Sequence, residues 1–144
     1  MQEVDAETFL DLESRAVDFP VRYPAMPEGW ITNSARRSML AGQPAPVVGW
    51  VTPDRGFIQL TQTGLDTDAA IENADSKPRT LDRTVDVDGH PVEVFASEEQ
   101  DVRDVWVVDA GEARFVLTGA GEDREFEELI ATALATAPIQ HPDQ

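Results

Sequence analysis

Histidine is the first residue type to examine for catalysis, because a serine, threonine or cysteine nucleophile needs a general base close to it in space. The chain has two histidines, His90 and His141, and no cysteine. His90 stands beside a predicted hairpin turn and His141 is close to the end of the chain, so neither lies on a rigid scaffold. The Gly-x-Ser-x-Gly, Gly-x-Gly-x-x-Gly, Gly-Lys-Ser/Thr and His-Glu-x-x-His motifs are also absent. We therefore expect no catalytic residues, and no nucleotide cofactor.

Carboxylates are the one catalytic device that the composition supplies in quantity, since glycoside cleavage uses two acids at a defined separation. With 28 Asp and Glu residues, however, some pair is always available by chance. The sequence places no such pair in a pocket or beside an aromatic platform. A carboxylate-dependent hydrolase is therefore the weakest of the function hypotheses.

Three aspartates before Gly89 resemble an oxygen-rich calcium loop: Asp82, Asp86 and Asp88. Their spacing does not fit the twelve-residue loop that has Asp or Asn at its first, third and fifth positions and a terminal Glu. Asp88-Gly89 is moreover the dipeptide that a tight hairpin turn needs. The pattern favours hairpin chemistry, and we expect neither a metal nor any other cofactor.

The three tryptophans, Trp30, Trp50 and Trp106, fall in or beside predicted strands, where a large ring usually fills the core. The same interpretation holds for the phenylalanines that open or end the partner strands, which are Phe57, Phe95 and Phe115. If one tryptophan is exposed in a groove, we expect it to be Trp30, because it follows a turn. The candidate contacts for a ligand or partner are Trp30, Arg36 and Trp50.

The charge balance excludes one class of partner. The chain carries 11 basic and 28 acidic residues, for a formal net charge of -17. A nucleic-acid-binding protein needs a basic stripe, and here the basic residues are interleaved with carboxylates. Anionic lipid surfaces would repel the domain for the same reason, so a membrane would be reached only through an anchor that this chain lacks. The simplest explanation of the acidity is that it keeps the protein soluble and monomeric or reflects a salt-adapted host, and cationic partners or divalent ions stay open as alternatives.

Pairs of apolar runs around short turn clusters predict antiparallel hairpins. The predicted pairs are 46–52 with 57–63, 84–87 with 90–95, and 102–108 with 113–118. A further strand is predicted over 30–37, after an extended segment at 19–24, and 38–46 is predicted as a loop. Such short connections favour antiparallel pairing, because a parallel crossover needs about a dozen residues or more. The sequence therefore predicts an antiparallel sheet of about six to seven strands.

Three segments have helical spacing of their apolar residues, and acids suited to a helix start: 5–17, 66–73 and 123–136. We expect an N-terminal helix, a short middle helix and a C-terminal helix that covers one face of the sheet, which is an α+β fold. The length fits a single domain over 1–137, followed by a tail at 138–144 without core residues. No apolar run is long enough to span a membrane, and the first residues do not form a signal peptide.

Four motifs carry a family resemblance: Phe19-Pro20-Val21-Arg22-Tyr23-Pro24, Pro27-Glu28-Gly29-Trp30, Asn33-Ser34-Ala35-Arg36 and Gly49-Trp50-Val51-Thr52-Pro53. With these motifs the sequence resembles an actinobacterial family known as a domain of unknown function, number 4245, over nearly the whole chain. The resemblance implies an extracytoplasmic domain that a membrane-spanning helix anchors in the cell envelope. It implies no reaction and no catalytic residues.

Two hypotheses remain beside the hydrolase. The first is a non-catalytic envelope domain that binds another protein or a cell-wall component. The second is a carrier or sensor of a small apolar ligand, such as a lipid or wall precursor, held between the sheet and a helix. The carrier would need a largely apolar cavity of ~300 Å³ or more.

Overall fold

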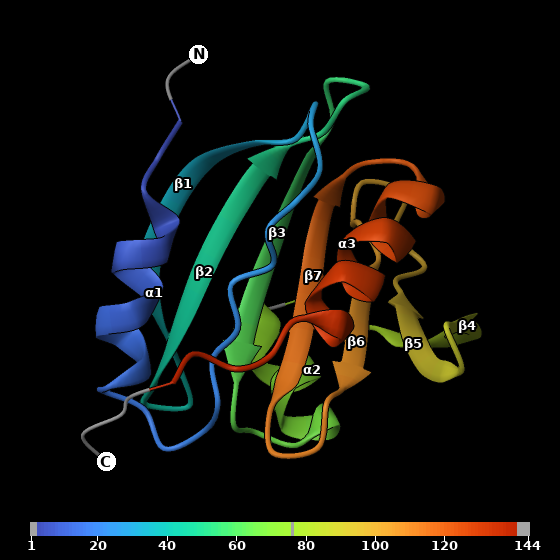
Figure 1. The fold of residues 1–144 in the computed structure, drawn as a ribbon. Helices are drawn as coiled ribbons and strands as arrows, with labels where there is room; N and C mark the ends of the chain where they lie inside the picture. Colours follow the sequence, from blue (N-terminus) through green and yellow to red (C-terminus); the bar gives the residue numbers. More distant parts are fainter. Residues whose placement is uncertain (1–2, 76, 141–144) are drawn as a thin grey trace.

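The structure is a computed structural model that describes residues 3–75 and 77–140. The fold is built on one seven-stranded sheet. Every neighbouring pair is antiparallel, and the strand order is β1-β2-β3-β7-β6-β5-β4 (Figure 1). The strands are β1 (Ile31–Leu40), β2 (Gln43–Val51), β3 (Phe57–Thr63), β4 (Thr80–Val87), β5 (His90–Ala96), β6 (Val105–Asp109) and β7 (Arg114–Ala120). The three predicted hairpins are all present, and the α+β class is confirmed.

The prediction of a loop over 38–46 was wrong. The end of β1 and the start of β2 occupy this range and are joined by a two-residue turn, Ala41-Gly42. Both turn residues have positive φ, 51° and 77°, which is the geometry that matches the twist of a hairpin. Alanine seldom adopts a positive φ, so Ala41 does not indicate a turn from sequence. The Asp-Gly pair at Asp88-Gly89, by contrast, is a recognised turn signal.

The three helices follow the predicted order, and acidic side chains begin each of them. They are α1 (Ala6–Ser14), α2 (Thr67–Ala74) and α3 (Asp123–Ala135). The carboxylates of Asp5 and Asp66 accept hydrogen bonds from backbone N–H groups in the first turns of α1 and α2, and a Glu122–Glu125 capping box begins α3. The first helix is shorter than the predicted 5–17: it begins at Ala6 and ends at Ser14.

The helices divide between the two faces of the sheet, with α1 and α3 on one face and α2 on the other (Figure 1). The main core lies under α1, α3 and the extended segment before β1, and it holds all three tryptophans, as predicted. The rings of Trp106 and Phe126 stack there with centroids 4.9 Å apart, so α3 covers one face of the sheet as expected. A smaller core of Ala70, Val105, Val107 and Val116 joins α2 to the opposite face.

The predicted tail is described only as far as residue 140; residues 141–144, and with them His141, lie outside the described residues. The expectation that this segment adds nothing to the core was wrong for Ile139, which packs against it. The Ile139 N–H donates a hydrogen bond to the Val21 carbonyl at 2.8 Å. No helix in the described parts of the chain is long and apolar enough to span a membrane.

Candidate ligand-binding pocket

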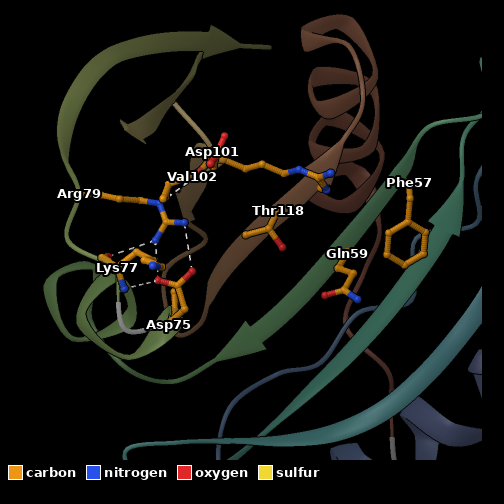
Figure 2. Close-up of a pocket in the computed structure, with 11 residues that line it drawn as sticks. Phe57, Gln59, Asp75, Lys77, Arg79, Asp101, Val102 and Thr118 are labelled. Carbon is orange, nitrogen blue, oxygen red and sulfur yellow. Dashed lines mark hydrogen bonds and ion pairs between the residues drawn. The ribbon is translucent and has the colours of Figure 1, made fainter. Parts of the chain in front are cut away.

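A pocket of about 540 Å³ lies on the face of the sheet that carries α2. Its floor comes from β3 and β7, and its wall from the end of α2 and from residues of two loops, 75 and 77–79 in one and 101–103 in the other. Figure 2 shows Gln59 and Thr118 on the sheet, with the loop residues facing them from one side. Two strands, a helix end and two loops therefore meet at one concave site.

The floor is polar because the strands alternate. Ile58 and Leu60 of β3 point into the main core, so Phe57 and Gln59 point to the opposite face. Gln59 is the register partner of Thr118 on β7, which places the amide and the hydroxyl side by side. Neither side chain forms a hydrogen bond within the described chain, so both are available to a ligand.

Phe57 completes the floor by lying against β2. An ideal Cβ at Gly49 would be 2.7 Å from Cζ and 3.0 Å from Cε2 of the Phe57 ring. Only a residue without a side chain lets the ring edge come this close to the strand. Phe57 remains half-buried, so part of its ring lines the pocket.

An ion pair fixes the wall of the pocket. The Arg79 guanidinium donates to both carboxylate oxygens of Asp75, at 2.8 and 3.1 Å (Figure 2). Its Nε donates to the Arg103 carbonyl at 2.9 Å, which ties the two loops together. The Arg79 side chain is only 4% exposed, whereas the Asp75 side chain is 45% exposed, so the pair joins a buried guanidinium to a carboxylate at the surface. The hydrogen bond from Arg79 is the main cause that lowers the pKa of Asp75.

Two further cations line the pocket, and the charge of one of them, Lys77, also helps to lower the pKa of Asp75. Lys77 and Arg103 are exposed, and neither side chain forms an ion pair within the described residues. Lys77 is the single lysine of the chain. With Arg79 they place three cations against two lining carboxylates, Asp75 and Asp101. In a chain of net charge -17, this pocket therefore has a locally positive lining.

The groups examined for catalysis and metal binding do not gather at the pocket. Asp86 instead accepts a hydrogen bond from the Gly89 N–H at 3.3 Å, as the hairpin interpretation predicts. His90 is exposed at the start of β5, beside the turn. Within residues 3–75 and 77–140, no group of three or more His, Cys, Asp or Glu side chains could hold a metal ion.

The candidate contact residues lie outside the pocket lining. Trp30 is 6% exposed and Trp50 1% exposed, so both belong to the core; the Trp30 indole Nε1 donates to Glu128 at 3.3 Å. Arg36 is exposed on the edge strand β1. Its register partner is Val47, which pairs with Thr61, so Arg36 lies on the same face of the sheet as Gln59. The role of these three residues in binding stays a prediction.

The sequence interpretation missed the residues that line the pocket. Phe57 was expected in the core with the other aromatic residues, but it is half-buried on the pocket face. Lys77 and Arg103 lie 26 positions apart in the sequence. The hydrogen bond from Arg79 to the Arg103 carbonyl joins the loops that carry them. The one available signal was that Lys77 is the single lysine, between Asp75 and Arg79.

Comparison with known proteins identifies a family. The model of a family described as a protein of unknown function (DUF4245) matches residues 1–133. No curated protein and no solved structure matches the chain.

Proposed function

The chain belongs to the DUF4245 family of proteins of unknown function, and from that premise we propose that it is a non-catalytic binding domain whose pocket beside α2 holds an anionic ligand. The observation that supports this proposal is that Lys77 and Arg103, which form no ion pair within residues 3–75 and 77–140, share one pocket of a strongly acidic chain. An ammonium and a guanidinium that lack protein partners are the groups that bind carboxylates and phosphates.

The rest of the molecule explains why such a site must act at short range. A net charge of -17 repels anions at a distance, and ions screen charges beyond ~10 Å at 0.1 M salt. Attraction therefore depends on direct contact with the cations of the pocket. We expect modest affinity that weakens as salt is added.

The pocket also separates the two earlier hypotheses. An apolar ligand held between the sheet and α3 would need the space that Trp106 and Phe126 fill with stacked rings. The concave, charged pocket suits a soluble acidic molecule, such as a cell-wall component, better than an apolar one. The family resemblance supports an extracytoplasmic, membrane-anchored place in the cell envelope, and we include that place in the proposal.

A titration followed by NMR tests the proposed function. Sodium acetate and inorganic phosphate are added to the 15N-labelled protein, to Lys77→Gln and to Arg103→Gln, at constant ionic strength. We expect saturable shifts of amides around 75–79 and 101–103, weakened by each variant.

The matched control is Arg55→Gln. It removes the same charge from an exposed arginine that has no ion pair within the described residues and does not line the pocket. This variant should bind both anions as the unmodified protein does. The proposal fails if no anion gives a saturable shift, or if Arg55→Gln weakens binding as much as Lys77→Gln.

A further inference from the structure

We propose that the ligand of this pocket is an acidic saccharide, a sugar ring that carries a single carboxylate. This inference rests on the proposed anion site and adds the chemistry of the remainder of the ligand. It follows from three kinds of group that share one pocket: an aromatic ring, two polar side chains without a hydrogen bond in the described part of the chain, and two cations without an ion pair there.

The aromatic ring belongs to Phe57. Gly49 lets the edge of this ring rest against β2, which fixes the ring while leaving part of it open to the pocket. The face of an aromatic ring is electron-rich and attracts positively polarised C–H groups. A sugar ring presents such C–H groups on one face, so Phe57 provides a platform on which it can stack.

The polar groups are Gln59 and Thr118. They are register partners on β3 and β7, and neither forms a hydrogen bond within the described residues. An amide has separate donor and acceptor atoms, and a hydroxyl can act as either. This combination matches sugar hydroxyls, which also donate and accept. A simple anion such as acetate would leave both side chains unused.

The charged group Lys77 lies across Gln59 and Thr118 from the Phe57 ring (Figure 2). Figure 2 shows Gln59 and Thr118 between Phe57 and the loop that holds Lys77. A sugar ring stacked on Phe57 would therefore direct an acid group toward Lys77, and Arg103 is available to the same group. The three cations and two carboxylates of the lining leave one net positive charge, which suits a ligand with one negative charge.

The helix beside the pocket argues against a nucleotide or another polyphosphate. Such ligands bind at helix N-termini, where backbone N–H groups and the positive end of the dipole face them. The pocket is instead lined by Ala74, the last residue of α2, so the negative end of the helix lies beside it. A singly charged carboxylate tolerates this position better than a phosphate group does.

The location on the sheet also argues against an acidic peptide added as a strand. Strand addition uses the unpaired backbone of an edge strand. The floor residues belong to β3 and β7, which are both paired on each side. The pocket therefore offers side chains rather than a backbone ladder to its ligand.

The test compares D-glucuronate with four probes: D-glucose, acetate, glucose 6-phosphate and AMP. Dissociation constants are measured by NMR titration on the unmodified protein, on Phe57→Leu and on Lys77→Gln. We expect glucuronate to bind at least about tenfold more tightly than acetate or glucose. Phe57→Leu should weaken glucuronate about three- to tenfold and leave acetate unchanged, because only the sugar uses the ring. Lys77→Gln should weaken both.

Two further variants make the result independent of how Phe57→Leu folds. Gln59→Leu should also weaken glucuronate but not acetate, whereas Phe95→Leu, on the same face but outside the lining, should change neither. If acetate and glucuronate bind equally and Phe57→Leu has no effect, the saccharide inference is overturned while the anion site stands. If no anion binds, both proposals fail. Tighter binding of AMP or glucose 6-phosphate than of glucuronate would overturn the carboxylated sugar in favour of a phosphate ligand.

Discussion

The ring of Phe57 takes the space that a side chain at residue 49 would need. An ideal Cβ on Gly49 would lie 2.7 Å from Cζ of Phe57 and 2.5 Å from Oγ of Ser34. Gly49 has no positive φ, so its backbone does not require glycine. The close approach of Phe57 and Ser34 does. The side chains of Phe57 on β3 and Ser34 on β1 therefore depend on this glycine for their close approach to β2.

Gly49→Ala should destabilise the protein by about 1–3 kcal/mol, because the added methyl group forces the Phe57 ring or the strand to move. Urea unfolding followed by fluorescence measures the change. The double variant Gly49→Ala with Phe57→Leu should be less destabilised than the sum of the two single variants, since the smaller side chain makes room. Additive effects would show that the ring does not limit residue 49.

The hairpins were predictable because their turns carry local chemistry. Pro53-Asp54-Arg55-Gly56 and Asp88-Gly89 signal turns within a few residues, and the structure has hairpins at both. The turn at Ala41-Gly42 was not predictable. The φ of 51° at Ala41 is imposed by the pairing of β1 with β2 and is not a conformation that alanine prefers. The sheet thus overrode local sequence at one turn.

The pocket was not predictable, because no local pattern joins its parts. Two residues of its floor, Gln59 and Thr118, are 59 positions apart in the sequence. They become neighbours through the pairing of β3 with β7. The wall depends on the hydrogen bond from Arg79 to the Arg103 carbonyl. The core tryptophans were predictable, in contrast, because a ring in an apolar strand has few alternatives to burial.

Arg79→Gln should lower the free energy of unfolding by about 1–3 kcal/mol, because it leaves the Arg103 carbonyl and Asp75 without their buried donor. Arg15→Gln is the matched control. Arg15 and Asp11 also form an ion pair four residues apart, but their side chains are 46% and 44% exposed. This control should cost less than about 0.5 kcal/mol. Equal losses in urea unfolding would show that burial of Arg79 does not matter.

Acid should weaken the same ion pair. The pKa of Asp75 is held below its ordinary value of 3.8, mainly by the hydrogen bond from Arg79. A depressed carboxyl pKa stabilises the folded state fully above the ordinary value, and this stability is lost as the pH falls through the folded-state pKa. The melting-temperature difference between the unmodified protein and Asp75→Asn should therefore be constant near neutral pH and shrink below about pH 4. A difference that does not change with pH would contradict this origin of the shift.

Arg22 fixes the end of α3 from a distant part of the chain. Its Nη1 donates to the carbonyls of Ala133, Leu134 and Thr136 at 3.3, 3.1 and 3.2 Å, and its guanidinium lies 5.7 Å from the centroid of the Phe115 ring. Helix C-termini leave their last carbonyls without partners, and a cation there also meets the negative end of the dipole.

Arg22→Met keeps an apolar chain beside Phe115 but removes the donor. It should therefore cost about 1–3 kcal/mol and speed hydrogen exchange in the last turn of α3. Arg22→Lys should lose less than Arg22→Met, because an ammonium keeps both the positive charge and N–H donors for the carbonyls at the helix end. Arg55→Met, at an exposed arginine, serves as the control and should leave both measurements unchanged. If Arg22→Met exchanges as slowly as the unmodified protein, the guanidinium does not hold the helix end, and the packing of Ile139 against the core must do so instead.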